Sequence, residues 1–72
     1  MIHPYSMVIQ WSDEDQVFVV TFPEFPGSQT HGATHEEAAR NAQEVLDLLI
    51  EGYQKEGRTL PAPRKIDSAA VA

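Results

Sequence analysis

Three histidines are the side chains in this sequence best suited to holding a metal ion. His31 and His35 lie four positions apart, and His3 could join them from a neighbouring strand end. His31 precedes the helix predicted below, whereas His35 lies in its first turn, so the two do not share a helical face as paired zinc ligands do. The chain also has no cysteine to supply thiolate ligands. We therefore expect exposed loop histidines, with no metal and no other cofactor.

The acidic run Asp13, Glu14 and Asp15 could supply the carboxylates of a hydrolase or a cation site. It lacks the glycine and the closing glutamate of a calcium loop, and a catalytic acid needs a desolvated or paired environment. We interpret the run as a solvated turn. Because no serine lies in a G-x-S-x-G context and no glycine belongs to a phosphate-binding loop, we predict that the protein is not an enzyme.

The length of 72 residues fits one small domain, and the net charge of −6 limits its partners. Nucleic-acid binding depends on clustered Lys and Arg, but the five basic residues here are scattered. An acidic surface suits a basic partner protein, although solubility alone would explain the charge equally well. A chain this short buries little surface by itself, so we also expect a homo-oligomer, dimer or tetramer.

No targeting or membrane segment is expected from the sequence. The first six residues form no basic-then-apolar signal, and no wholly apolar run, Val17–Val20 included, exceeds four residues. We expect a soluble, cytoplasmic protein.

Three short strands are predicted in the first half of the chain. Tyr5–Trp11 alternates between apolar and polar residues, and Val17–Phe22 is β-branched and aromatic, so the two form a β-hairpin around the acidic turn. Both faces of Val17–Phe22 are apolar, which indicates a strand that is central or covered on both sides. Ser28–Gly32 is polar and is predicted as a short edge strand.

A tight turn separates the second and third strands. Pro26 and Gly27 occupy the central positions of a type II turn over Phe25–Ser28, where proline and then a positive φ are favoured. Phe25 has two interpretations that the sequence leaves open. Its side chain either plugs the end of the core or anchors a contact with another protein.

One amphipathic helix follows. Thr34 and Glu37 have the spacing of a capping box, and Gly57 is the candidate stop signal. Apolar residues then recur every three or four positions, which predicts that one face of the helix covers the sheet. That face comprises Ala38, Ala42, Val45, Leu46, Leu49, Ile50 and Tyr53. The opposite face carries Glu36, Glu37, Arg40, Glu44, Asp47 and Glu51.

The C-terminal part is predicted as an extended segment with a brief edge strand at Arg64–Ile66. We assign residues 1–66 to one domain and residues 67–72 to a disordered tail. The order is therefore β-β-β-α with a possible final strand, an α+β fold in which one helix packs on an antiparallel sheet.

Several of these motifs together resemble the HicB antitoxin family. The resemblance rests on Phe22–Gly27, on Thr30 and Gly32, and on Thr34–Ala38 followed by Asn41-Ala42. It covers residues 5 to about 63. Two positions depart from the family pattern, since Ser28 stands where many members have cysteine and Ala33 where many have aspartate.

The resemblance implies a partial RNase H-like fold without nuclease activity. Typical HicB antitoxins bind and neutralise HicA, a small basic toxin that cleaves mRNA, and many add a C-terminal DNA-binding domain. Too few residues follow Leu60 for that domain, so we expect no direct nucleic-acid binding. We expect this chain to bind a HicA-type toxin by covering its RNA-binding face. The alternative is a solitary HicB-like oligomeric module without a toxin.

Two regions are the candidate protein interface under this hypothesis. The acidic helix residues would match the charge of a basic toxin, and the Pro-Gly turn would add apolar contact. The candidate residues are Phe25, Pro26, Gly27, Glu36, Glu37, Glu44, Asp47 and Glu51.

Overall fold

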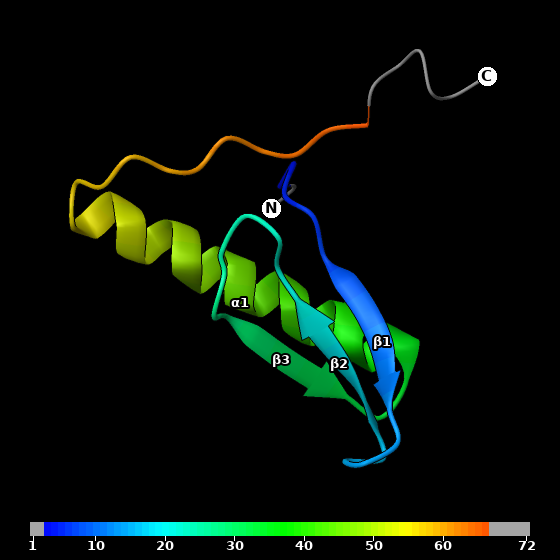
Figure 1. Cartoon of the computed structure of the whole chain (residues 1–72). Coiled ribbons are helices and arrows are strands. Elements are labelled where there is room, and N and C mark those ends of the chain that lie inside the picture. Colours follow the sequence, from blue (N-terminus) through cyan, green and yellow to red (C-terminus); the bar gives the residue numbers. More distant parts are fainter. Residues whose placement is uncertain (1–2, 67–72) are drawn as a thin grey trace.

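A computed structural model describes residues 3–66 of the chain. Strand β1 spans Val8–Ser12, β2 spans Val17–Thr21 and β3 spans Gln29–Gly32, and helix α1 spans His35–Lys55. The strands form one antiparallel sheet in the order β1-β2-β3. Helix α1 lies across one side of this sheet (Figure 1). The predicted α+β arrangement of three strands followed by one helix is confirmed.

The β1–β2 hairpin turns through the acidic run, as predicted. Gln16 closes the turn with a positive φ of 57°, and its backbone N–H donates to the Ser12 carbonyl at 2.8 Å. The Asp13, Glu14 and Asp15 side chains are exposed to solvent. Asp13 accepts a hydrogen bond from the Trp11 indole at 2.7 Å, which fixes that half-exposed ring.

The type II turn between β2 and β3 is also confirmed. Gly27 has a φ of 90°, a value that L side chains rarely adopt, and Ser28 N–H donates to the Phe25 carbonyl at 3.1 Å. Phe25 itself is only 3 % exposed. Its ring packs edge-on against Tyr5 and Tyr53, with centroids 5.0 and 5.6 Å away. Of the two interpretations of Phe25, the core plug is therefore confirmed.

Helix α1 begins and ends at its predicted signals. The Thr34 hydroxyl accepts from Glu37 N–H at 3.0 Å, although among the described residues the reciprocal bond of a capping box does not form. At the other end Gly57 has a φ of 67°, and the N–H groups of Gly57 and Arg58 donate to the carbonyls of Gln54 and Tyr53. This pairing satisfies the last carbonyls of the helix.

The core lies between α1 and one face of the sheet. Its buried members come from β2, from the turn after β2 and from the predicted apolar stripe of the helix. They are Val20, Phe22, Phe25, Ala38, Ala42 and Leu46. Gly32 lets β3 approach the helix start, because a Cβ on it would lie 2.7 Å from the Ala38 Cα.

The predicted final strand is wrong for the residues that the structure describes. After α1 the chain stays extended to Ile66 without pairing in a sheet. Pro61 and Pro63 have no N–H to donate, and the N–H of Arg64 donates instead to the Glu24 carboxylate at 2.8 Å. Residues 67–72, predicted as a tail, lie outside the described residues. The extent of the domain stays a prediction.

Candidate protein-binding site on the outer face of the helix

The side of α1 that faces away from the sheet carries most of the predicted interface residues. Because positions three and four apart share a helical face, Glu44, Leu48, Glu51 and Lys55 form one stripe along it. Glu44 and Glu51 are exposed. We call the surface formed by Glu36, Glu37, Glu44, Leu48 and Glu51 the acidic helix face.

Leu48 is the residue of this surface that the sequence interpretation missed. Its side chain is 67 % exposed, whereas its neighbours Leu46 and Leu49 turn toward the core. Glu44 precedes it by four positions and Glu51 follows it by three. The signal was present in the sequence, since Leu48 falls outside the apolar stripe and among the acidic positions. A large apolar side chain ringed by charge is a typical anchor for a protein contact.

Few of the carboxylates on this face are neutralised within the chain. Glu51 pairs with Lys55 at 3.2 Å, but both side chains are largely exposed, so the pair contributes little to stability. Glu36 and Arg40 lie four positions apart on the helix but form no ion pair among the described residues. The negative potential of this face therefore remains available to a partner.

Asp47 has a different role from the other candidate acids. Its carboxylate is bonded by the His3 ring, whose side chain is only 4 % exposed. This contact ties the N-terminal segment to α1, 44 positions along the chain. Asp47 is 47 % exposed but already has a partner within the chain, and we leave it out of the acidic helix face.

The second predicted region, around the Pro-Gly turn, presents only part of its residues. Pro26 and Gly27 are exposed, and they line a hollow of about 370 Å³ with residues from the end of β2 and the start of β3. Phe25 is buried beneath them. Apolar contact at this turn is therefore limited to Pro26 and the backbone.

The three histidines are not brought together. His3 contacts Asp47, His31 is exposed on β3, and the His35 ring packs on Phe18 with centroids 4.1 Å apart. Within residues 3–66 no group of three or more His, Asp or Glu side chains is placed to hold a metal ion. In the same range no helix is long and apolar enough to span a membrane.

Glu24 is a buried carboxylate that the sequence interpretation did not single out. It is 7 % exposed and accepts from Ser6 N–H at 3.0 Å, from the Ser6 hydroxyl at 3.1 Å and from Arg64 N–H at 2.8 Å. Burial by itself raises the pKa of this carboxyl, but the donors from Arg64 and Ser6 outweigh it and hold the pKa below the usual value. The charge is thus satisfied by two backbone N–H groups and the Ser6 hydroxyl, which gives Glu24 a structural role.

Comparison with known proteins places this arrangement in a family. The family described as "HicB_like antitoxin of bacterial toxin-antitoxin system" matches residues 5–72. This chain belongs to the HicB-like antitoxin family. As a HicB-like protein it is a member of the toxin-antitoxin systems, and membership suggests a regulatory protein rather than an enzyme.

Two relatives of this chain are UPF0150 proteins. A UPF0150 protein of Thermoplasma acidophilum is 37 % identical over 57 residues, covering 79 % of this chain and 81 % of the relative. A UPF0150 protein of Thermotoga maritima is 36 % identical over 47 residues, covering 65 % of this chain and 63 % of the relative. No solved structure gives a significant match.

Proposed function

We propose that this HicB-like protein binds a small basic toxin of the HicA type and neutralises it by covering its RNA-binding face. The observation that carries the proposal is the acidic helix face, where the exposed Glu44 and Glu51 flank the 67 % exposed Leu48. A toxin that binds RNA needs a basic surface, so the two surfaces are complementary in charge. Leu48 supplies the apolar anchor that charge alone lacks.

We also propose the compartment, the self-association and the fold family of this protein. The protein acts in the cytoplasm, self-associates as a dimer or tetramer, has a partial RNase H-like fold without nuclease activity and does not bind nucleic acid directly. Its net charge of −6 disfavours contact with phosphates, which supports the last statement. Pro26 and Gly27 at the exposed turn form a secondary contact beside the main one.

The proposal is tested by co-expressing the protein with the product of the small open reading frame adjacent to its gene and asking whether that product is a basic protein that binds. We expect the two to co-elute and the RNase activity of the partner to disappear in the complex. Leu48→Asp and the double change Glu44→Lys with Glu51→Lys should each weaken the complex about 10- to 100-fold, as loss of a hot spot does.

The matched control is Glu14→Lys, which reverses an exposed charge on the hairpin turn, outside α1. It should leave the affinity within about twofold, as expected for a charge outside the contact. If all variants bind as well as the unchanged protein, the acidic helix face is not the binding site. If no basic protein binds at all, the alternative of a solitary HicB-like module without a toxin is favoured.

A further inference from the structure

One face of the sheet has no element packed on it in the part of the chain that the structure describes. Helix α1 covers the face that holds Val20, which is fully buried, and Ile9 and Phe18 point the same way. Successive side chains of a strand alternate between faces, so the residues between these point to the opposite side. This open sheet face consists of Val8, Gln10, Ser12, Val17, Val19, Thr21, Gln29 and His31. In Figure 1 no helix or strand lies over it.

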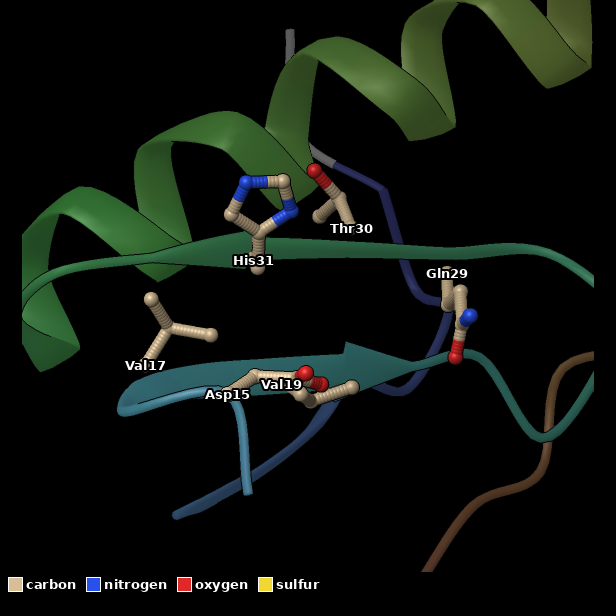
Figure 2. A pocket seen from close by; sticks show the side chains of 6 residues that line it. All are labelled: Asp15, Val17, Val19, Gln29, Thr30 and His31. Carbon is tan, nitrogen blue, oxygen red and sulfur yellow. The ribbon is translucent and has the colours of Figure 1, made fainter. Parts of the chain in front are cut away.

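The central strand has the sequence of a strand covered on both faces. Val17 and Val19 lie on the open side although a solvated face normally carries polar residues at such positions. Each is still partly exposed. They form the floor of a hollow of about 470 Å³, walled by Gln29, Thr30 and His31 of β3 (Figure 2). The apolar content of this face is therefore unexplained by contacts within one copy.

Charge indicates which kind of molecule fits there. The strands contribute no Asp, Glu, Lys or Arg to the open sheet face, and Asp15 reaches the hollow only from the turn at its end. A basic toxin would find no charge complementarity on this face. A second copy carries the same net charge of −6, so contact through an uncharged face is where it meets the least repulsion.

We propose that a second copy of this chain packs on the open sheet face, so that two sheets stack about a two-fold axis with Val19 near its centre. Stacked sheets bury their inner side chains in a common core about 10 Å thick, which would complete the second layer that β2 lacks. Both copies use the same residues, as a two-fold interface requires. The acidic helix faces then lie on the two outer sides of the dimer, free for toxin.

This inference rests on the proposed self-association but not on the proposed toxin. Three strands of four or five residues make a face smaller than the roughly 800 Å² per partner of a standard interface. We therefore expect a reversible dimer whose mass, measured by sedimentation equilibrium, falls on dilution through the micromolar range.

A charged residue at position 19 tests whether the open sheet face is the contact between two copies. Val19→Lys and Val19→Glu should both weaken the dimer at least tenfold, because each copy would bring a like charge to the same point. Comparing the two variants distinguishes repulsion at the interface from repulsion between the net charges of the two copies. Val19→Lys lowers the net negative charge of the protein, so a weaker dimer in that variant must come from the two lysines facing each other. The control Gln43→Glu adds charge at an exposed position of α1 and should leave the dimer unchanged. Far-UV circular dichroism checks that each variant is folded.

A cross-linking experiment keeps the proposal testable if charge at Val19 unfolds the chain. The protein has no cysteine, so Val19→Cys introduces a single thiol of similar size. Mild oxidation should join two copies by a disulfide through Cys at this position, whereas the Gln43→Cys protein should form no such covalent cross-link. If the unchanged protein is monomeric at millimolar concentration, both the self-association and its assignment to the open sheet face are wrong. If the dimer persists in Val19→Lys and the Val19→Cys protein does not cross-link, the protein self-associates but not through the open sheet face.

Discussion

At the scale of single residues, Glu24 holds together parts of the chain that the secondary structure leaves loose. The segments before β1 and after α1 pair with no strand, yet both donate to this one carboxylate, through Ser6 and Arg64. Tyr5 adds a hydrogen bond from its hydroxyl to the Pro61 carbonyl at 2.9 Å. The segments around Ser6 and Arg64 are thus held by side-chain hydrogen bonds rather than by pairing in a sheet.

Glu24→Gln should destabilise the protein by about 2 kcal/mol, because hydrogen bonds to a charged group contribute about 1.5–3 kcal/mol. The amide keeps one acceptor oxygen and turns an NH₂ group toward donors that cannot accept from it. The free energy of unfolding in urea at pH 7 measures the loss. Glu14→Gln, at an exposed position of the hairpin, should change that free energy by less than about 0.5 kcal/mol.

The stability supplied by Glu24 should also depend on pH. Its pKa in the folded protein lies below the ordinary value of 4.5, so the unfolded chain takes up a proton first as the pH falls. The contribution is complete above pH 4.5 and is lost as the pH drops through the lower folded pKa. The difference in unfolding free energy between the unchanged protein and Glu24→Gln should be constant from pH 7 to 5 and shrink below that. A difference that grew on acidification would contradict the depressed pKa.

At the scale of elements, the packing of β3 on α1 depends on a glycine. A Cβ at Gly32 would meet backbone atoms of the helix, 2.7 Å from the Ala38 Cα and 2.9 Å from the Glu37 carbonyl carbon. Backbone atoms cannot rotate away as a side chain can, so the strand and the helix start must separate. Gly52, in contrast, has open space around its Cβ position although it lies within α1.

Gly32→Ala and Gly52→Ala should therefore shift stability in opposite directions. We expect Gly32→Ala to cost more than about 2 kcal/mol, as overpacking of a tight contact does. Gly52→Ala should stabilise by about 1 kcal/mol, because alanine has the higher helix propensity. Thermal unfolding followed at 222 nm measures both. Equal effects of the two changes would show that the β3–α1 contact is looser than the structure indicates.

At the scale of the whole molecule, two surfaces differ in kind. The acidic helix face is charged and suits a basic partner, whereas the open sheet face is uncharged and suits a second copy. They lie on opposite sides of the protein, since the sheet separates α1 from the open face (Figure 1). The two proposed contacts would therefore not compete for the same surface.

The contact with the basic partner and the contact between two copies should respond differently to salt. Raising NaCl from about 50 mM to about 500 mM shortens the screening length severalfold, so association with the basic partner should slow about tenfold or more. The self-association constant should rise or stay level, because screening reduces repulsion between two acidic copies. Stopped-flow binding measures the first effect and sedimentation equilibrium the second. A toxin association rate that ignores salt would contradict a contact through the acidic helix face.

Local signals in the sequence predicted the order of the three strands and the helix and both ends of the helix, but not the start of β1 at Val8 or the absence of a strand at 64–66. Thr34 and Gly57 bound the helix, and Pro26-Gly27 turns the chain, because caps and turns depend on side chains a few residues apart. The spacing of apolar residues also identified the helix face that covers the sheet. The acidic outer face of α1 followed from the same periodicity, and only Leu48 was missed there.

Contacts between distant residues were decided by the tertiary structure alone. Ser6, Glu24 and Arg64 meet across up to 58 positions of the chain, as do His3 and Asp47 across 44, and no local pattern encodes such a meeting. The burial of Phe25 was left open by the sequence because a turn residue can face either way. Likewise, the apolar residues on both sides of β2 indicated that two faces need cover, but only the fold shows that α1 supplies one of them and leaves the other open. Whether a residue is on a surface depends on what the rest of the chain places against it, and that is a property of the folded molecule.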